Sequence, residues 1–129
     1  FHGYTYSAHP AACAAGIATQ KIYQSEKIFE RSAALEDYFL DAIWTLQDHP
    51  LVADIRGIGL MAGVEVHSDG VAGRRGGKLQ KDMFWNGLHV KWTGDNAIVA
   101  PAFIAERKHI DEIVDKFRKT LDETLEASV

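Results

Sequence analysis

The stretch that decides the fold is residues 52–66, VADIRGIGLMAGVEV. Short β-branched or apolar runs are separated in it by Gly57 and Gly59, a pattern typical of two strands joined by a tight turn. The glycines also come close to the G-x-G-x-x-G pattern of nucleotide-binding loops, but their spacing is one residue too long. A strand follows them, whereas that pattern binds phosphate through the N-terminus of a helix. We therefore predict a strand pair and not a nucleotide site.

Helices are predicted on the N-terminal side of this strand pair. Pro10 suits the first turn of a helix, and the alanine-rich run after it predicts a helix over residues 9–24. Ser25 can cap a second helix, in which apolar residues recur at helical spacing as far as Gln47. His49 and Pro50 then end it, because the residue before a proline disfavours helical geometry.

On the C-terminal side of this strand pair we predict a loop, a short helix, two strands and a last helix. Residues 68–77 are rich in glycine and charge and are expected to form an exposed loop. A short helix follows to about Asn86, with Gly87 where a left-handed cap is usual. Residues 88–92 and 96–100 flank Thr93-Gly94-Asp95 as the strands of a hairpin, and apolar steps of three and four predict a last helix over 106–125.

This order of elements predicts an α+β fold. We expect a small, mostly antiparallel sheet covered by helices on one face and preceded by a connector helix. Residues 1–24 are expected to be the connector, and residues 25–129 the folded domain.

The composition limits the classes of function. Fourteen basic and eighteen acidic side chains give a formal charge of −4 without a clustered basic face, so nucleic acid is not an expected partner. No apolar run reaches membrane-spanning length, so no membrane partner is expected either. A single cysteine, Cys13, cannot form an intrachain disulfide and favours a cytoplasmic location. The histidines lack metal-ligand spacing, so no metal site is predicted.

Hydroxyl groups gather just before the first predicted helix. Tyr4, Thr5, Tyr6 and Ser7 precede a helix N-terminus, where free backbone amides and the helix dipole favour an anion such as phosphate. The alternative is structural: Ser7 caps the helix, and the aromatic rings fill an interface.

Four stretches resemble one enzyme family. Residues 2–15, HGYTYSAHPAACAA, are similar to the H-G-x-T-Y-S-x-H-P-x-A-C-A-A block of class III aminotransferases. Residues 55–65, 87–95 and 100–104 match further stretches of that family in the same order, so the resemblance covers nearly the whole chain. Among subfamilies the chain looks most like the ω-amino acid:pyruvate group, which includes β-alanine:pyruvate transaminases.

The resemblance implies a fold type I enzyme that uses pyridoxal 5'-phosphate as its cofactor and acts as a homodimer. In such enzymes a large domain carries the lysine that holds the cofactor, and a C-terminal segment forms a small domain beside the active site. Residues 1–24 would then be a connector from the large domain, and residues 25–129 the C-terminal small domain. No lysine of this chain matches the cofactor lysine, so the chain is expected to hold no catalytic residue and to be inactive alone.

The same resemblance assigns site residues. Thr5 corresponds to the threonine that reaches across the dimer interface to the cofactor phosphate, and Tyr4 to an aromatic residue that helps line the neighbouring subunit's pocket. Lys91 stands where the relatives usually carry an arginine that binds the substrate carboxylate. A lysine keeps the charge but lacks the planar guanidinium, so carboxylate binding could be weaker, differently placed or lost. Trp92 is expected to line the substrate channel; a solvent-facing Lys91 is the alternative.

The expected reaction moves an amino group from an ω-amino acid or amine to a keto acid such as pyruvate. Two alternatives remain open at this point. One is a class III relative with other pyridoxal-phosphate chemistry, such as an aminomutase or a decarboxylase. The other is a non-enzymatic α+β module that binds small molecules.

Overall fold

The computed structural model describes residues 3–127. Its elements are, in chain order, α1 (Pro10–Ser25), α2 (Ile28–Ala33), α3 (Glu36–Trp44), the 3-10 helix η1 (Thr45–Asp48), β1 (Val52–Ile58), β2 (Met61–Val66), α4 (Arg74–Trp85), β3 (Lys91–Thr93), β4 (Asn96–Val99) and α5 (Arg107–Glu126). In this part of the chain no helix is both long and apolar enough to cross a membrane.

The strands form one antiparallel sheet in the order β1-β2-β4-β3. The strand pair predicted from residues 52–66 corresponds to β1, at one edge of the sheet, and β2, in its centre. The turn between β1 and β2 contains Gly59 at φ 59°, a left-handed conformation that glycine adopts without strain. The short strand β3 forms the other edge, and within the described part of the chain it pairs with β4 alone.

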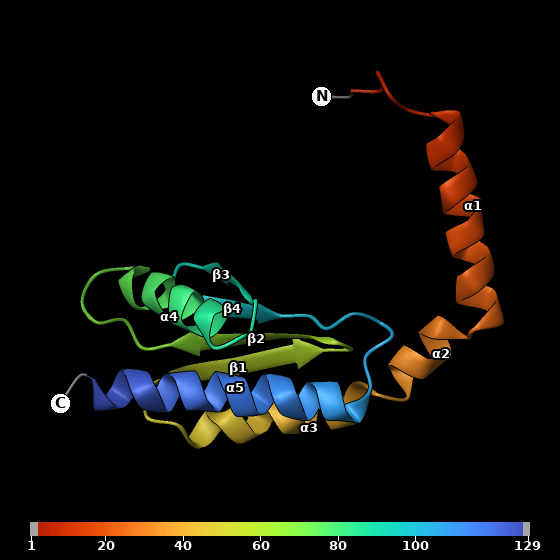
Figure 1. Ribbon diagram of the computed structural model, residues 1–129. Coiled ribbons are helices and arrows are strands. Elements are labelled where there is room, and N and C mark those ends of the chain that lie inside the picture. Colours follow the sequence, from red (N-terminus) through yellow and green to blue (C-terminus); the bar gives the residue numbers. More distant parts are fainter. Residues whose placement is uncertain (1–2, 128–129) are drawn as a thin grey trace.

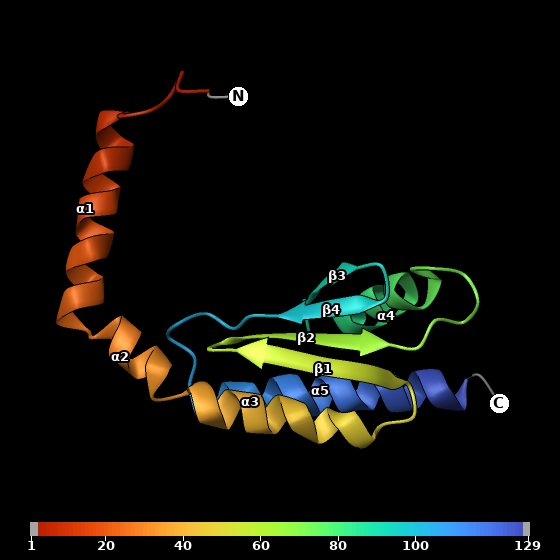
Figure 2. The same ribbon diagram turned by 180° about the vertical axis from the view of Figure 1, so that it is seen from behind.

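Helices α3, α4 and α5 cover a single face of the sheet (Figures 1 and 2). Side chains alternate between the two faces, so in β2 the buried residues are Ala62, Val64 and Val66. They join one hydrophobic core with residues of all three helices, including Phe39, Met83 and Phe117, each 0% exposed. The predicted α+β fold with helices on one face is confirmed.

The prediction of one continuous helix from Ser25 to Gln47 is wrong, because α2 and α3 are separate helices. Lys27 adopts the left-handed conformation at φ 50° and separates α1 from α2. The hydroxyl of Ser32 donates to the carbonyl of Ile28 over 2.8 Å, a bond that competes with the helix ladder and often bends it. Glu36 at the start of α3 accepts a 3.0 Å hydrogen bond from the Gly59 amide, which holds α3 against the β1–β2 turn.

The predicted loop over residues 68–77 is also too long, because α4 begins at Arg74. The carboxylate of Asp95 accepts hydrogen bonds from the amides of Gly73 and Gly76 and so caps this helix from a distant part of the chain. At the other end of α4, Gly87 has φ 80°, as predicted for a left-handed cap.

Helix α1 extends away from the rest of the structure (Figure 1). None of its residues is buried, and Ile17 and Ile22 are 59% and 49% exposed. Its neighbour in the structure is α2, where Tyr23 of α1 contacts Phe29 edge-on with ring centroids 5.1 Å apart. The domain boundary proposed at residue 24 stays a prediction.

Candidate functional site

The hydroxyl-rich segment before α1 forms a turn. The Ser7 amide donates to the Tyr4 carbonyl over 3.0 Å, and the His9 amide to the Tyr6 carbonyl over 3.3 Å. Tyr4 is 69% exposed, and Thr5 is exposed as well. The N-cap residue of α1 is His9, and no side chain of the described residues caps its amides. Ser7 therefore does not act as the helix cap that the structural alternative required.

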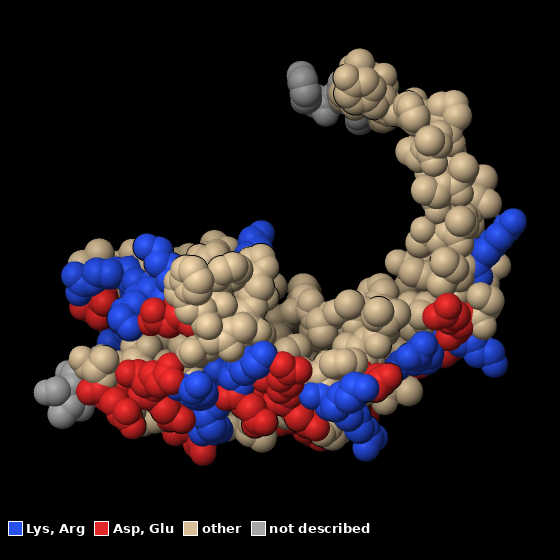
Figure 3. All heavy atoms as spheres, viewed as in Figure 1, with Lys and Arg blue, Asp and Glu red and all other residues tan. Residues whose placement is uncertain are grey.

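The charge around this segment suits an anion. The first Asp, Glu, Lys or Arg of the chain is Lys21, so neither the turn nor the first half of α1 carries a charged side chain of these types. Figure 3 shows this end of the chain without acidic or basic surface. Exposed hydroxyls, uncapped amides and the absence of nearby carboxylates together fit a phosphate group.

Lys91 lies at the start of the edge strand β3, on the face of the sheet that the helices leave open. It is exposed and pairs across the sheet with Ile98. Within residues 3–127 its ammonium has no hydrogen bond or ion pair. It borders a hollow of about 380 Å³ that also includes His89, Ala100 and Pro101. Lys91 is thus a free cation beside a partly apolar recess.

Trp92 points to the opposite face. Only 9% of it is exposed, and its ring stacks on Phe117 of α5 with centroids 6.2 Å apart and an interplanar angle of 26°. Its indole Nε1 is buried without a hydrogen-bond partner among the described residues. The two neighbouring residues predicted at the substrate therefore lie on different faces, and Trp92 belongs to the hydrophobic core. This placement gives no support to a Trp92 substrate contact.

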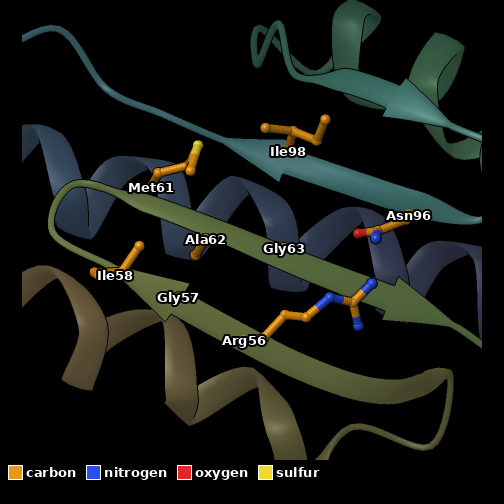
Figure 4. Close-up of a pocket in the computed structure, with 8 residues that line it drawn as sticks. All are labelled: Arg56, Gly57, Ile58, Met61, Ala62, Gly63, Asn96 and Ile98. Carbon is orange, nitrogen blue, oxygen red and sulfur yellow. The ribbon is translucent and has the colours of Figure 1, made fainter.

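Sequence reasoning missed a second recess on the open face of the sheet (Figure 4). Its volume is about 440 Å³, and its lining includes Arg56, Gly63, Asn96 and Ile98. The guanidinium of Arg56 donates to Asp54 over 2.6 Å and to Glu65 over 3.1 Å. These bonds, of which the one to Asp54 has the larger effect, raise the pKa of Arg56. The two carboxylates balance the positive charge of the guanidinium. Alternation in β1 and β2 was the signal that could have placed these side chains on one face.

The predicted residues do not form one site within a single chain. The segment with Tyr4 and Thr5 lies beyond the far end of α1, whereas Lys91 lies on the sheet, and the two regions are well apart in both ribbon views (Figures 1 and 2). Residues 3–127 contain no cluster of three or more His, Cys, Asp or Glu that could bind a metal ion.

Comparison with known proteins identifies the family. Residues 1–121 match the family model described as Aminotransferase class-III. The chain is 43% identical over 122 residues to an omega-aminotransferase of Caulobacter vibrioides, covering 94% of this chain and 28% of that protein. It is 35% identical over 134 residues to a putrescine–pyruvate aminotransferase of Pseudomonas aeruginosa, covering 98% of this chain and 29% of that protein.

A solved structure agrees with these relatives. A thermostable omega transaminase variant from Pseudomonas jessenii superposes with a TM-score of 0.88 at 31% identity, over 95% of this chain and 29% of that one. This chain thus spans less than a third of the length of the relatives it matches. The family match extends through the hydroxyl-rich segment, the sheet and most of α5, and the chain belongs to the class III aminotransferases.

Proposed function

We propose that this chain is the C-terminal part of a transaminase that moves an amino group from an ω-amino acid or amine to a keto acid such as pyruvate. The observation that carries the proposal is the family match over residues 1–121. Relatives named omega-aminotransferase and putrescine–pyruvate aminotransferase support the classes of donor and acceptor. The parent protein would be a homodimer. A cytoplasmic location, expected from the single cysteine, stays a prediction.

The cofactor would be pyridoxal 5'-phosphate, which when bound supplies the electron sink for amino transfer. Thr5 would hold its phosphate through the side-chain hydroxyl, and Tyr4 would line the pocket beside it. Both side chains are exposed and lie in a segment without acidic residues. The separation of this segment from Lys91 supports a contribution across a dimer interface, with Thr5 of one protomer serving the site of its partner.

Lys91 would bind the carboxylate of the acceptor. Its exposed ammonium has no partner among residues 3–127, so forming an ion pair with a substrate breaks no existing bond. A lysine ammonium is a point charge on a flexible stem and lacks the two parallel donors of arginine. Lys91 would therefore orient a carboxylate less strictly than an arginine would.

The test is amino transfer by the full-length protein loaded with pyridoxal phosphate. The protein is incubated with 13C-labelled pyruvate and either β-alanine or putrescine, and products are followed by NMR. Labelled alanine that forms only when both donor and enzyme are present supports the proposal. An amino group that migrates within the donor without pyruvate would indicate an aminomutase, and release of carbon dioxide from the donor a decarboxylase. Binding without turnover would favour the small-molecule-binding module.

A further inference from the structure

The turn that follows Lys91 is joined to helix α4 by one carboxylate. Oδ2 of Asp95 accepts a 2.9 Å hydrogen bond from the Gly73 amide, and Oδ1 accepts one of 2.9 Å from the Gly76 amide. The carbonyl of the same residue accepts a 2.9 Å bond from the Val66 amide at the end of β2. Asp95 thus connects the β3–β4 turn, the N-terminus of α4 and the centre of the sheet.

The contact between turn and helix is also sterically matched. A Cβ atom on Gly76 would lie 2.0 Å from the carbonyl oxygen of Gly94, a distance that no side chain can occupy. Gly94 itself has φ 61°, in the left-handed region that favours glycine. The approach of α4 to the turn therefore depends on Gly76 and on the two bonds to Asp95. An anion cannot bind these helix amides from solution, because the Asp95 carboxylate already fills that position.

The position of Lys91 depends on this attachment more than the position of a residue in a central strand would. Strand β3 has three residues and pairs with β4, through Lys91–Ile98, Trp92–Ala97 and Thr93–Asn96. Among residues 3–127 no strand lies beside its other edge. Strand β3 is also held in place by the burial of Trp92 and by the packing of α4 against the strand. A shift of the turn would be transmitted to Lys91 through only two intervening residues of β3.

We propose that Asp95 is a positioning residue that sets where the Lys91 ammonium lies, and thereby the preference of the enzyme for acceptors with a carboxylate. This inference rests on the proposed function, because it takes Lys91 as the carboxylate-binding residue. Asp95 does not touch the substrate in this account. It acts by fixing the β3–β4 turn on the N-terminus of α4.

The experiment compares two acceptors in the full-length, cofactor-loaded protein with one amine donor. Pyruvate carries the carboxylate and butanal does not, so the ratio of their kcat/KM values reports carboxylate recognition. In Asp95→Ala the value for pyruvate should fall about tenfold, while that for butanal changes much less, because small displacements of a substrate-binding group have effects of this size or larger. Asp95→Asn keeps one acceptor oxygen and should recover part of the loss.

A second route to the same displacement is Gly76→Ala, whose Cβ would push α4 away from Gly94 and the Asp95 backbone while the Asp95 carboxylate is kept. Gly76→Ala should also lower the pyruvate-to-butanal ratio. If Asp95→Ala does not fold, Gly76→Ala and Asp95→Asn together replace it as the test. A coupling test uses Lys91→Met as background. There Asp95→Asn should leave the ratio unchanged, because the residue that it positions no longer carries a charge.

The outcomes separate this inference from the proposed function. Equal losses for pyruvate and butanal in both Asp95→Asn and Gly76→Ala would mean that Asp95 only stabilises the fold, and would overturn the inference while the role of Lys91 stands. If Lys91→Met itself leaves the ratio unchanged, then Lys91 does not bind the carboxylate, and the inference falls with that role. The supporting result has two parts. The ratio falls in Lys91→Met, in Asp95→Asn and in Gly76→Ala, and adding Asp95→Asn to Lys91→Met lowers it no further.

Discussion

His49 and Asp122 join the end of η1 to helix α5, with 3.2 Å between Nε2 of the imidazole and Oδ1 of the carboxylate. His49 is 4% exposed, and its Nδ1 accepts a 3.1 Å hydrogen bond from the Leu51 amide. Because Nδ1 accepts, Nε2 is the ring nitrogen that carries a proton, and it donates to Asp122. One side chain therefore satisfies a buried backbone amide and connects two elements.

His49→Ala should destabilise the fold by about 1–3 kcal/mol, since the Leu51 amide would be left buried without a partner. Asp122→Asn is the matched control, because the amide keeps an acceptor oxygen for Nε2 at a side chain that is 56% exposed. Its effect should stay within about 0.5 kcal/mol. Urea unfolding measures both. Equal losses of unfolding free energy in His49→Ala and Asp122→Asn would mean that the hydrogen bond from the Leu51 amide to His49 contributes nothing to stability.

Trp92→Phe tests whether Trp92 is a core residue. The smaller ring leaves some space, but the substitution also removes the Nε1 donor, and a buried unpaired polar group costs about 1–3 kcal/mol. The net change should be within about 1 kcal/mol, whereas Trp92→Ala should cost about 3–5 kcal/mol. Trp92→Phe should leave the pyruvate-to-butanal ratio unaltered. A large change in that ratio at unchanged stability would mean that Trp92 is more than a core residue and affects acceptor recognition, by direct contact or through the position of β3.

The orientation of Trp92 shows where reasoning from the sequence stopped short. The hairpin that contains Lys91 and Trp92 was predicted, and adjacent residues of a strand point to opposite faces. The two residues could therefore not both face the substrate through β3. The rule was available from the sequence, but only the packing of Phe117 on Trp92 shows which of the two faces inward.

Other differences come from contacts between distant residues. Apolar spacing predicts helix over residues 25–47, but no local pattern shows that Glu36 bonds to the Gly59 amide or that Lys27 takes the left-handed conformation. The start of α4 at Arg74 depends likewise on Asp95, which follows it by many residues. The strand pair of residues 52–66 and the last helix were predictable because alternation and helical periodicity act locally.

The ion pair between Asp69 and Arg74 predicts a pH effect. Arg74 Nε donates to Asp69 over 2.9 Å, and this bond is the main reason that the pKa of Asp69 lies below its ordinary value of about 3.9. A carboxyl with a lowered folded-state pKa stabilises the fold at neutral pH, and this contribution is lost as the pH falls through the folded-state pKa. The Arg74 side chain is 59% exposed and that of Asp69 26%, so solvent screens the pair and the effect on stability should be small.

Arg74→Gln should raise the pKa of Asp69 toward the ordinary value, as measured by carbon-13 NMR titration of its carboxyl carbon. Arg118→Gln is the control, because Arg118 pairs with Asp48 at 3.0 Å and should leave Asp69 unchanged. An unaltered Asp69 titration in Arg74→Gln would show that the pair does not form in solution.

Thr5 is tested by titrating the full-length protein, stripped of cofactor, with pyridoxal phosphate. Thr5→Ala should raise the Kd about tenfold or more, since a hydrogen bond to a charged group contributes about 1.5–3 kcal/mol. Thr5→Ser keeps the hydroxyl and should bind nearly as tightly as the unaltered protein. Visible absorbance follows the binding. Equal Kd values for Thr5→Ala and Thr5→Ser would remove the hydroxyl from the phosphate site.

The most direct test of the account is the effect of Lys91→Met on the full-length, cofactor-loaded protein with pyruvate and butanal as competing classes of acceptor. Methionine has a similar length without the charge, and the exposed Lys91 has no partner among residues 3–127 whose loss could disturb the fold. We predict that kcat/KM for pyruvate falls about tenfold or more, as expected when a charge-assisted contact is lost, and that the value for butanal changes little. Unchanged values for both acceptors, or equal losses for both, would contradict the claim that Lys91 binds the acceptor carboxylate.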